Sequence, residues 1–200
     1  YYDRAEDAAE AHFNNFIKPL LDKYLFKSKP NFCIELACGH GRITQFLIDY
    51  FDTVLGIDIV PENIDFCKRR FENSIMSKFQ FNVCNGIDFD GIADRSSDLV
   101  LCWDSMVHFD TDIIRQYIRD TKRILKERGI AIYHHSNYTK DPTGNFQKAP
   151  HARNFMSKEL FAHYSYKEGL MVLEQNLMNW GGISNHDCIS VLALPSYQKS

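Results

Sequence analysis

The sequence lacks the features that would place a protein in or across a membrane. No apolar run approaches the ~20 residues needed to cross a bilayer, and the N-terminal residues contain no signal-peptide core. An excess of basic residues is missing too, because 23 lysines and arginines stand against 26 aspartates and glutamates, which disfavours a broad nucleic-acid-binding surface. We therefore expect a cytoplasmic protein that binds neither a membrane nor nucleic acid.

Cysteine motifs are missing as well. The six cysteines form no C-x-x-C pair and have no spacing typical of a zinc site. Most of them lie in apolar, strand-like segments, so we expect reduced and buried thiols. Cys38 differs because it lies in a glycine-containing turn, and there we expect it to pack under the loop.

The chain does contain strands and helices in alternation. Its 200 residues are 44% hydrophobic, which is enough for one large core. The segments expected as strands are 32–37, 53–58, 79–84, 98–103 and 130–135, followed by a closing antiparallel pair at 170–178 and 187–194. This rhythm predicts an α/β fold: a single domain over 1–200 with one doubly wound, mostly parallel, seven-stranded sheet whose last strand is antiparallel.

Two segments depart from that rhythm. Residues 1–30 are expected to form an N-terminal covering helix, whose apolar stripe is interrupted only by Pro19. Residues 136–156 have turn chemistry and no period, and we interpret them as a lid insertion. Asp110 and Thr111 are expected to cap the helix before the fifth strand, and Gly129 to end it.

The first strand ends in a turn that contains two glycines. Gly39 and Gly41 lack side chains that would hold a ligand away from the backbone, and the helix expected over 41–50 would point its free N–H groups at the ligand. Dinucleotides and S-adenosylmethionine are both bound by such turns. Nicotinamide-binding turns have a third glycine where this chain has Thr44, so the dinucleotide fingerprint is incomplete.

The turn resembles motif I of the class I S-adenosylmethionine-dependent methyltransferases, an acidic residue followed by small residues and G-x-G. The matching residues are Glu35, Ala37, Cys38, Gly39 and Gly41, with alanine at 37 where glycine is usual. The resemblance extends over about residues 31–194 and implies a Rossmann-like methyltransferase fold with S-adenosylmethionine as the cofactor. It also implies further cofactor-binding residues after the next strands: Asp58 at the ribose, Ile59 beside the adenine, Asn85 and Gly86 at the adenine edge, and Trp103 near the methyl donor.

Four polar residues after the strands are candidates for the chemistry: Asp104, His108, His135 and Arg153. A hydroxyl acceptor needs a base, which suits histidine, and we favour His108 and His135. Strand alternation puts His134 and His135 on opposite sides, so at most one faces the pocket. Arg153 could hold an anionic acceptor through its fork, and Asp104 could orient an amine.

Other roles stay open for these residues. Asp104 with His134 or His135 could hold a divalent metal, but no close-spaced ligand motif supports this, and we assign no metal ligand. His108 could instead cap the next helix, Arg153 could form a surface ion pair, and Trp103 could belong to the core.

We predict an S-adenosylmethionine-dependent O-methyltransferase acting on a small polar acceptor, with a sugar or a phosphorylated or nucleotide-linked glycan precursor as the candidate. The segment after the fifth strand loosely resembles bacterial methyltransferases that modify surface polysaccharides. The sequence 104–107 is DSMV rather than the Asn/Asp-Pro-Pro-aromatic motif of nucleic-acid N-methyltransferases. An N-methyltransferase for a small amine, a non-catalytic adenosylmethionine-binding partner protein and a nicotinamide oxidoreductase are the alternatives. The oligomeric state stays open.

Overall fold

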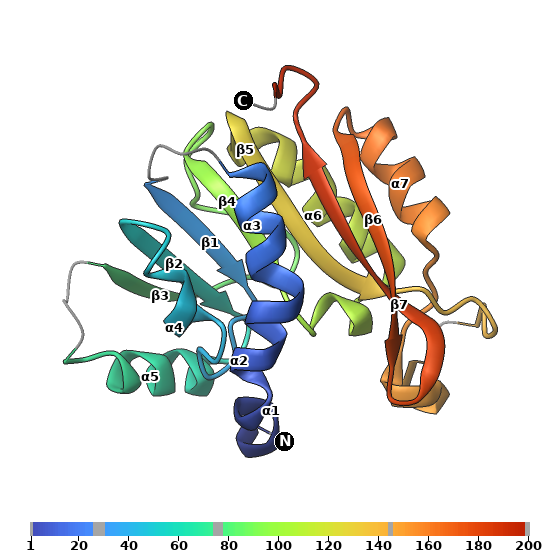
Figure 1. Cartoon of the computed structure of the whole chain (residues 1–200), viewed down its shortest axis with the longest axis horizontal. Helices are drawn as coiled ribbons and strands as arrows, with labels where there is room; N and C mark the ends of the chain where they lie inside the picture. Colours follow the sequence, from blue (N-terminus) through green and yellow to red (C-terminus); the bar gives the residue numbers. More distant parts are fainter. Residues whose placement is uncertain (1, 26–30, 74–77, 144–145, 199–200) are drawn as a thin grey trace.

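The computed structural model describes residues 2–25, 31–73, 78–143 and 146–198. Within these residues seven strands form one sheet in the order β3-β2-β1-β4-β5-β7-β6 (Figure 1). The strands are β1 (Phe32–Leu36), β2 (Thr53–Asp58), β3 (Phe79–Val83), β4 (Ser97–Cys102), β5 (Leu125–Ser136), β6 (Met171–Trp180) and β7 (Ile183–Ala193). No helix among the described residues is long and apolar enough to span a membrane.

The direction of the strands follows the prediction. β1 pairs in parallel with β2 and β4, β2 with β3, and β4 with β5, whereas β7 runs antiparallel to both of its neighbours. Gly181 and Gly182 both have positive φ angles, and the tight turn that they form reverses the chain between Trp180 and Ile183. The predicted α/β fold with a mostly parallel sheet and an antiparallel last strand is therefore confirmed.

Helices cover both faces of the sheet (Figure 1). They are α1 (Tyr2–Asp7), α2 (Ala9–His12), η1 (Phe13–Ile17), α3 (Lys18–Tyr24), α4 (Thr44–Leu47), α5 (Pro61–Arg70), the short 3-10 helices η2 (Met106–His108), η3 (Phe146–Lys148) and η4 (Pro150–Ala152), α6 (Thr111–Ile124) and α7 (Lys158–Lys167). α3 crosses the front face in Figure 1, with α6 and α7 behind the sheet. Leu101 of β4 is buried in the front core and Val100 in the back core, as the alternation of a strand covered on both faces requires.

The expected covering helix is a chain of short helices. η1 is a wider, π-helical turn that ends two residues before Pro19. The proline ring would clash with the carbonyl group four residues earlier and supplies no N–H donor, so a widened turn accommodates it without breaking the helix. Residues 1 and 26–30, also assigned to this helix, lie outside the described residues.

Two predicted boundaries are wrong. α6 ends at Ile124 rather than at Gly129, which lies inside β5. A Cβ atom at Gly129 would lie 2.7 Å from the carbonyl oxygen of Ser97, so this glycine permits close backbone approach between strands and does not end a helix. The helix expected over 41–50 is reduced to the single turn α4, because residues 39–43 stay in turns with positive φ angles at Gly39 and Gly41.

Candidate functional site

A cavity of about 270 Å³ lies at the carboxyl ends of β1, β2 and β4. Its lining is polar in large part and consists of Glu35, Ala37, Cys38, Gly39, His40, Arg42, Ile43, Asp58, Val60, Asn63, Trp103, Asp104, Ser105, His108 and Phe109. A second cavity of about 210 Å³ shares Ala37 and Phe109 with the first. It is mainly apolar, and its other lining residues are Leu36, Ile59, Cys84, Gly86, Asp110, Ile113 and Tyr117. The two cavities together offer one polar and one apolar compartment at the edge where open α/β sheets bind ligands.

The glycine turn forms one wall of the polar cavity. Ala37, Gly39 and Gly41 have φ angles of 56°, 55° and 76°, a left-handed conformation that glycine adopts readily and alanine does not. A Cβ atom at Gly41 would lie 2.6 Å from the ring of Phe71, so this position also needs glycine for packing. Strain at Ala37 places a non-glycine outlier where the two cavities meet, which is typical of functional sites.

Asp58 connects this turn to the end of β2. Its carboxylate accepts hydrogen bonds from the backbone N–H groups of Gly39 and Val60, both at 2.9 Å, and from the amide of Asn63 at 3.2 Å. The side chain is buried, and it lines the polar cavity. Asp58 is therefore held in a fixed position. Its Oδ1 atom already accepts two hydrogen bonds, whereas Oδ2 accepts one, from Gly39, and can accept another from a ligand.

Two further residues of the turn are buried below it. Burial raises the pKa of Glu35 to about 7, although the hydroxyl of Thr44 donates a hydrogen bond to its carboxylate. A hydrogen bond with Cys67 and burial raise the pKa of the Cys38 thiol well above its ordinary value. Cys38 is consequently not a reactive thiolate. It is a packing residue, which agrees with the expectation from its position in the sequence.

The residues predicted at the adenine edge are only partly at a cavity. Ile59 and Gly86 line the apolar cavity, and a Cβ atom at Gly86 would lie 2.9 Å from the side chain of Ile59. The side chain of Asn85 instead accepts hydrogen bonds from the N–H groups of Ile87 and Asp88. Asn85 thus closes its own turn and is not among the lining residues of either cavity, and its role at the adenine edge stays a prediction.

Trp103 lies between the cavity and the N-terminal helices. Its ring stacks on Phe16 at a centroid distance of 5.6 Å, and its Nε1–H group donates to Nδ1 of His12 at 3.4 Å. The same nitrogen of His12 lies 3.4 Å from a guanidinium nitrogen of Arg42. Trp103 is therefore both a cavity wall and a core residue, and the N-terminal helices are attached to the site through His12.

Asp104 is held more tightly than its sequence context indicates. Its φ angle is 53°, its carboxylate pairs with Arg42 at 2.8 Å, and Arg153 lies 3.8 Å from its other oxygen. Because two guanidinium groups flank this carboxylate, its charge is compensated inside the protein.

The two adjacent histidines of β5 lie on opposite faces of the sheet. His134 packs against Trp103 on the front face, where Nδ1 accepts a hydrogen bond from the backbone N–H of Asp104 at 3.2 Å. His135 is fully buried on the back face and stacks on Phe161 at 3.9 Å, and burial lowers its pKa to about 3. The predicted placement of His135 at the pocket is wrong, since α7 covers it.

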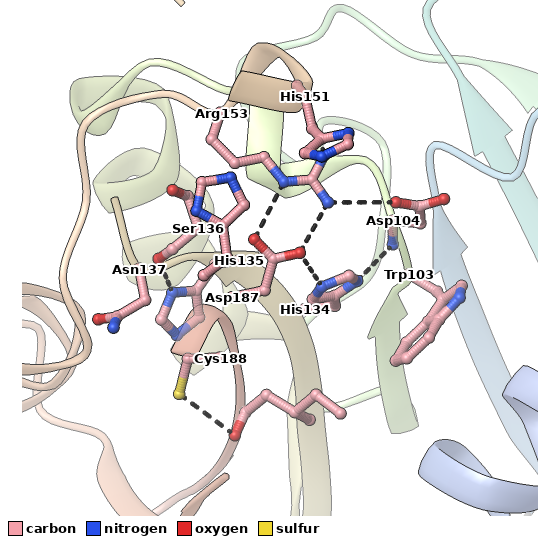
Figure 2. A network of polar contacts seen from close by, with 12 residues as sticks. Trp103, Asp104, His134, His135, Ser136, Asn137, His151, Arg153, Asp187 and Cys188 are labelled. Atoms are coloured by element: carbon pink, nitrogen blue, oxygen red, sulfur yellow. Dashed lines mark hydrogen bonds and ion pairs between the residues drawn. The ribbon is translucent and has the colours of Figure 1, made fainter. Parts of the chain in front are cut away.

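Arg153 lies inside the protein rather than at its surface. Its guanidinium group donates to both oxygens of Asp187, at 3.0 and 2.6 Å, and Figure 2 shows this pair next to His134 and Asp104. Burial alone would raise the pKa of Asp187, but hydrogen bonds from His134 and Arg153 lower it to about 2. The prediction that Arg153 holds an anionic acceptor is wrong in placement, because its fork is occupied by Asp187 and it does not line the cavity.

His108 does line the polar cavity, on η2. Its Nδ1 lies 2.6 Å from the carbonyl oxygen of Ala152, and because a carbonyl oxygen only accepts, Nδ1 carries the proton. The Nε2 atom of a neutral imidazole with this tautomer is a hydrogen-bond acceptor. His108 does not cap α6, because its Nδ1–H group donates to Ala152 in residues 136–156, the predicted lid segment.

The part of the lid segment described in the structure is attached to the body of the fold. The amide of Asn154 donates to Asp110, the hydroxyl of Thr111 donates to the carbonyl group of Phe155, and Tyr138 forms a bridge with Phe155. Asp110 and Thr111 thus hold the lid segment instead of providing side-chain caps for α6. Residues 144 and 145 lie outside the described residues.

Comparisons with known proteins agree with this geometry. Residues 33–129 match the family model of a methyltransferase domain. YqeM of Bacillus subtilis (strain 168), a protein described as a methyltransferase, is 31% identical over 109 residues. That match covers 52% of this chain and 42% of YqeM, so it spans less than half of the relative's length.

Residues 33–129 of this chain are therefore similar to a methyltransferase domain.

Solved structures of methyltransferases share the fold of this chain. A TehB-like S-adenosylmethionine-dependent methyltransferase from Corynebacterium glutamicum has a TM-score of 0.67 and 18% identity, with 97% of this chain and 96% of that chain covered. Geranyl diphosphate C-methyltransferase from Streptomyces coelicolor A3(2), solved with Mg²⁺, geranyl diphosphate and S-adenosylhomocysteine, has a TM-score of 0.71 and 15% identity, with 94% and 83% covered. These similarities agree with the predicted methyltransferase family and with S-adenosylmethionine as its predicted cofactor.

Sequence reasoning missed several residues of the candidate site. Arg42 directly follows the second glycine of the turn, and this position was the available signal for a residue at the cavity. His12 and Asp187 reach the site from the two ends of the chain, and no local pattern marks them. Among the described residues no group of three or more histidine, cysteine, aspartate or glutamate side chains is arranged to hold a metal ion.

Proposed function

We propose that this protein transfers the methyl group of S-adenosylmethionine to a hydroxyl group of a small polar acceptor, with His108 as the general base. The bound cofactor supplies an electrophilic methyl group on a sulfonium ion. The protein then has to align the acceptor, exclude water and remove a proton. The acceptor oxygen forms a bond to the methyl carbon as the bond to sulfur breaks, and the acceptor proton passes to Nε2 of His108.

The two joined cavities suit the cofactor. Asp58 presents Oδ2, which can accept a hydrogen bond from a ribose hydroxyl group, next to the glycine turn. Ile59 and Gly86 offer an apolar slot for a flat base, and Ile59 is 60% exposed without a ligand. Glu35, Ala37, Cys38, Gly39, Gly41 and Trp103 complete the proposed cofactor-binding set.

The observation that carries the proposal is the orientation of His108. The carbonyl group of Ala152 holds Nδ1 at 2.6 Å, which leaves Nε2 as the basic atom of a residue that lines the cavity. Asp104 also lines it, but Arg42 and Arg153 neutralise its carboxylate. An amine acceptor that arrives as a cation would gain little from a compensated carboxylate, so the geometry favours an oxygen acceptor over the N-methyltransferase alternative.

Calorimetry and a turnover assay test the two parts of the proposal. We expect the protein to bind S-adenosylmethionine and S-adenosylhomocysteine but not NAD, and binding of NAD alone would refute it. A panel of free sugars, nucleotide-linked sugars, small carboxylates and small amines, assayed for formation of S-adenosylhomocysteine, tests the acceptor. Turnover of a hydroxyl compound that falls in His108→Gln without a change in cofactor affinity is the expected result.

The alternatives give different results in the same assays. Methylation of amines only would indicate an N-methyltransferase. Turnover that His108→Gln leaves unchanged would indicate an acceptor that is already anionic, such as a carboxylate. Cofactor binding without turnover of any acceptor in the panel would favour a non-catalytic adenosylmethionine-binding protein.

A further inference from the structure

Asp187 is the centre of a buried polar network that lies behind the cavity (Figure 2). It is a residue of β7 with no exposed surface, and it does not line the cavity. Among the residues that the structure describes, its carboxylate forms hydrogen bonds with two charged or titratable partners only, His134 at 3.0 Å and Arg153 at 2.6 and 3.0 Å. Each partner leads to one of the polar groups at the cavity.

The first connection leads through His134 to Asp104. The backbone N–H of Asp104 is a donor, so Nδ1 of His134 must be unprotonated, and Nε2 carries the proton that it donates to Asp187. Asp187 thereby fixes the tautomer of His134, in the way that a carboxylate fixes a histidine in other sites. His134 in turn holds the backbone of Asp104, which has a left-handed φ angle of 53°.

The second connection leads through Arg153 to His108. Arg153 follows Ala152, whose carbonyl oxygen accepts the hydrogen bond from Nδ1 of His108. His151 and Ala152 have φ angles of 52° and 53°, a left-handed conformation that is strained for residues other than glycine. Arg153 also donates to the carbonyl oxygen of His151 at 3.0 Å, so its bidentate pair with Asp187 holds the strained turn in place.

We propose that Asp187 is a positioning residue that orients Asp104 through His134 and His108 through Arg153. This inference rests on the proposed function, in which His108 is the base. Without the carboxylate the guanidinium group loses its bidentate partner and, of the two carboxylate contacts that the structure describes, keeps only the longer one, with Asp104 at 3.8 Å, and the turn at His151 and Ala152 relaxes. His108 then loses the carbonyl group that selects its Nδ1–H tautomer.

The chain offers a matched control on the same strand. Ser190 of β7 is also fully buried, and its hydroxyl lies 2.8 Å from Nε2 of His135. This contact lies on the opposite face of the sheet, where His135 stacks on Phe161. Ser190→Ala therefore removes a buried hydrogen bond of β7 without touching the network of Asp187.

The test reads the histidine tautomers directly and needs no acceptor. The full chain is labelled with ¹⁵N-histidine, and two-bond ¹H–¹⁵N spectra are recorded for the unmodified protein, Asp187→Asn and Ser190→Ala, with His108→Gln and His134→Gln for assignment. The unmodified protein should show one fixed tautomer for His108, with the proton on Nδ1, and one for His134, with the proton on Nε2. In Asp187→Asn the ¹⁵N chemical shifts of the two ring nitrogens of His108 should become more similar as its tautomers exchange. Among the histidines, Ser190→Ala should change the chemical shifts of His135 only.

Arg153→Lys keeps the protein testable if circular dichroism shows that Asp187→Asn does not fold. Lysine keeps the charge but cannot donate from two fixed nitrogens, so His108 should lose its tautomer while His134 keeps its own. An unchanged tautomer of His108 in the folded variant, or an equal disturbance of His108 by Ser190→Ala, would overturn the inference.

Calorimetry separates this inference from the proposed function. The affinity of Ser190→Ala for S-adenosylmethionine should stay within about twofold of the unmodified protein, because neither Ser190 nor its partner His135 lines the cavity. Failure of the unmodified protein to bind the cofactor would refute the proposed function and leave the tautomer result standing. A fixed tautomer in every variant would refute the role of Asp187 and leave the cofactor site standing.

Discussion

Glu35 should make the stability of the protein depend on pH in a direction opposite to that of most carboxylates. It is 3% exposed, and burial raises its pKa from the ordinary value of 4.5 to about 7. The hydrogen bond from Thr44 and the positive charges of Arg42 and Arg70 oppose this effect of burial but do not cancel it. Glu35→Gln has nearly the same shape and does not titrate, so it isolates the effect.

The sign follows from proton binding in the two states. Between pH 4.5 and pH 7 the folded protein holds a proton on Glu35 that the unfolded chain has released. The contribution of Glu35 to stability is therefore fully present below the unfolded pKa and is lost as the pH rises through the folded pKa. The loss from pH 5 to pH 8 amounts to about 2 to 3 kcal/mol, since a tenfold change in a proton equilibrium corresponds to about 1.4 kcal/mol.

Urea unfolding at pH 5, 6, 7 and 8, without cofactor, measures this dependence. The difference in unfolding free energy between Glu35→Gln and the unmodified protein should move in favour of the variant by about 2 to 3 kcal/mol from pH 5 to pH 8, or about 1 M in the midpoint. Taking the difference cancels all other titrating groups that are independent of Glu35. Glu62→Gln, which removes an exposed carboxylate, controls for the loss of a charge. A difference that stays constant across this range, or moves against the variant, would refute the reasoning.

Three further predictions concern the turn and the back face. Asp58→Asn keeps the shape of the side chain but places an N–H₂ group against a backbone donor, so the dissociation constant for S-adenosylmethionine should rise at least about tenfold in calorimetry. An unchanged dissociation constant would remove Asp58 from the cofactor site. Gly41→Ala and Gly91→Ala both introduce a side chain at φ +76°, but only the one at Gly41 would meet Phe71. Gly41→Ala should therefore lower the free energy of unfolding by about 1–3 kcal/mol more than Gly91→Ala does, and equal losses would contradict the packing argument. His135 has a pKa of about 3 instead of the ordinary 6.5, so its contribution to the free energy of unfolding is lost as the pH falls. In urea unfolding the unmodified protein should lose about 2 to 3 kcal/mol of unfolding free energy between pH 6.5 and pH 4.5, relative to His135→Gln.

The sheet and the ligand-binding edge could be predicted from the sequence because their signals are local. The alternation of apolar strands and amphipathic helices is sufficient for a parallel sheet, and the carboxyl ends of parallel strands meet at one edge. Gly39, Gly41 and Asp58 are all recognisable from a few neighbouring residues. The structure brings them together as predicted, with the carboxylate of Asp58 2.9 Å from the N–H of Gly39.

The choice between His134 and His135 could not be made in this way. Strand alternation correctly predicts that the two rings lie on opposite faces, but it does not tell which face has room for a ligand. That depends on partners far away in the sequence, Asp187 for His134 and Phe161 for His135. Neither partner has a signature that connects it with β5.

Arg153 illustrates the same limit and leads to a conclusion about the acceptor. A guanidinium group near a site indicates an anion, and the structure contains that anion, but it is Asp187, 34 residues away in the same chain. Arg42 is likewise paired, with Asp104, so the positive charges of both guanidinium groups are compensated within the protein. A cavity whose guanidinium groups are already paired gains little from a negatively charged acceptor atom, and an uncharged hydroxyl group brings a proton that Nε2 of His108 can accept. The pairing of Arg153 with Asp187 therefore supports the same acceptor chemistry as the tautomer of His108.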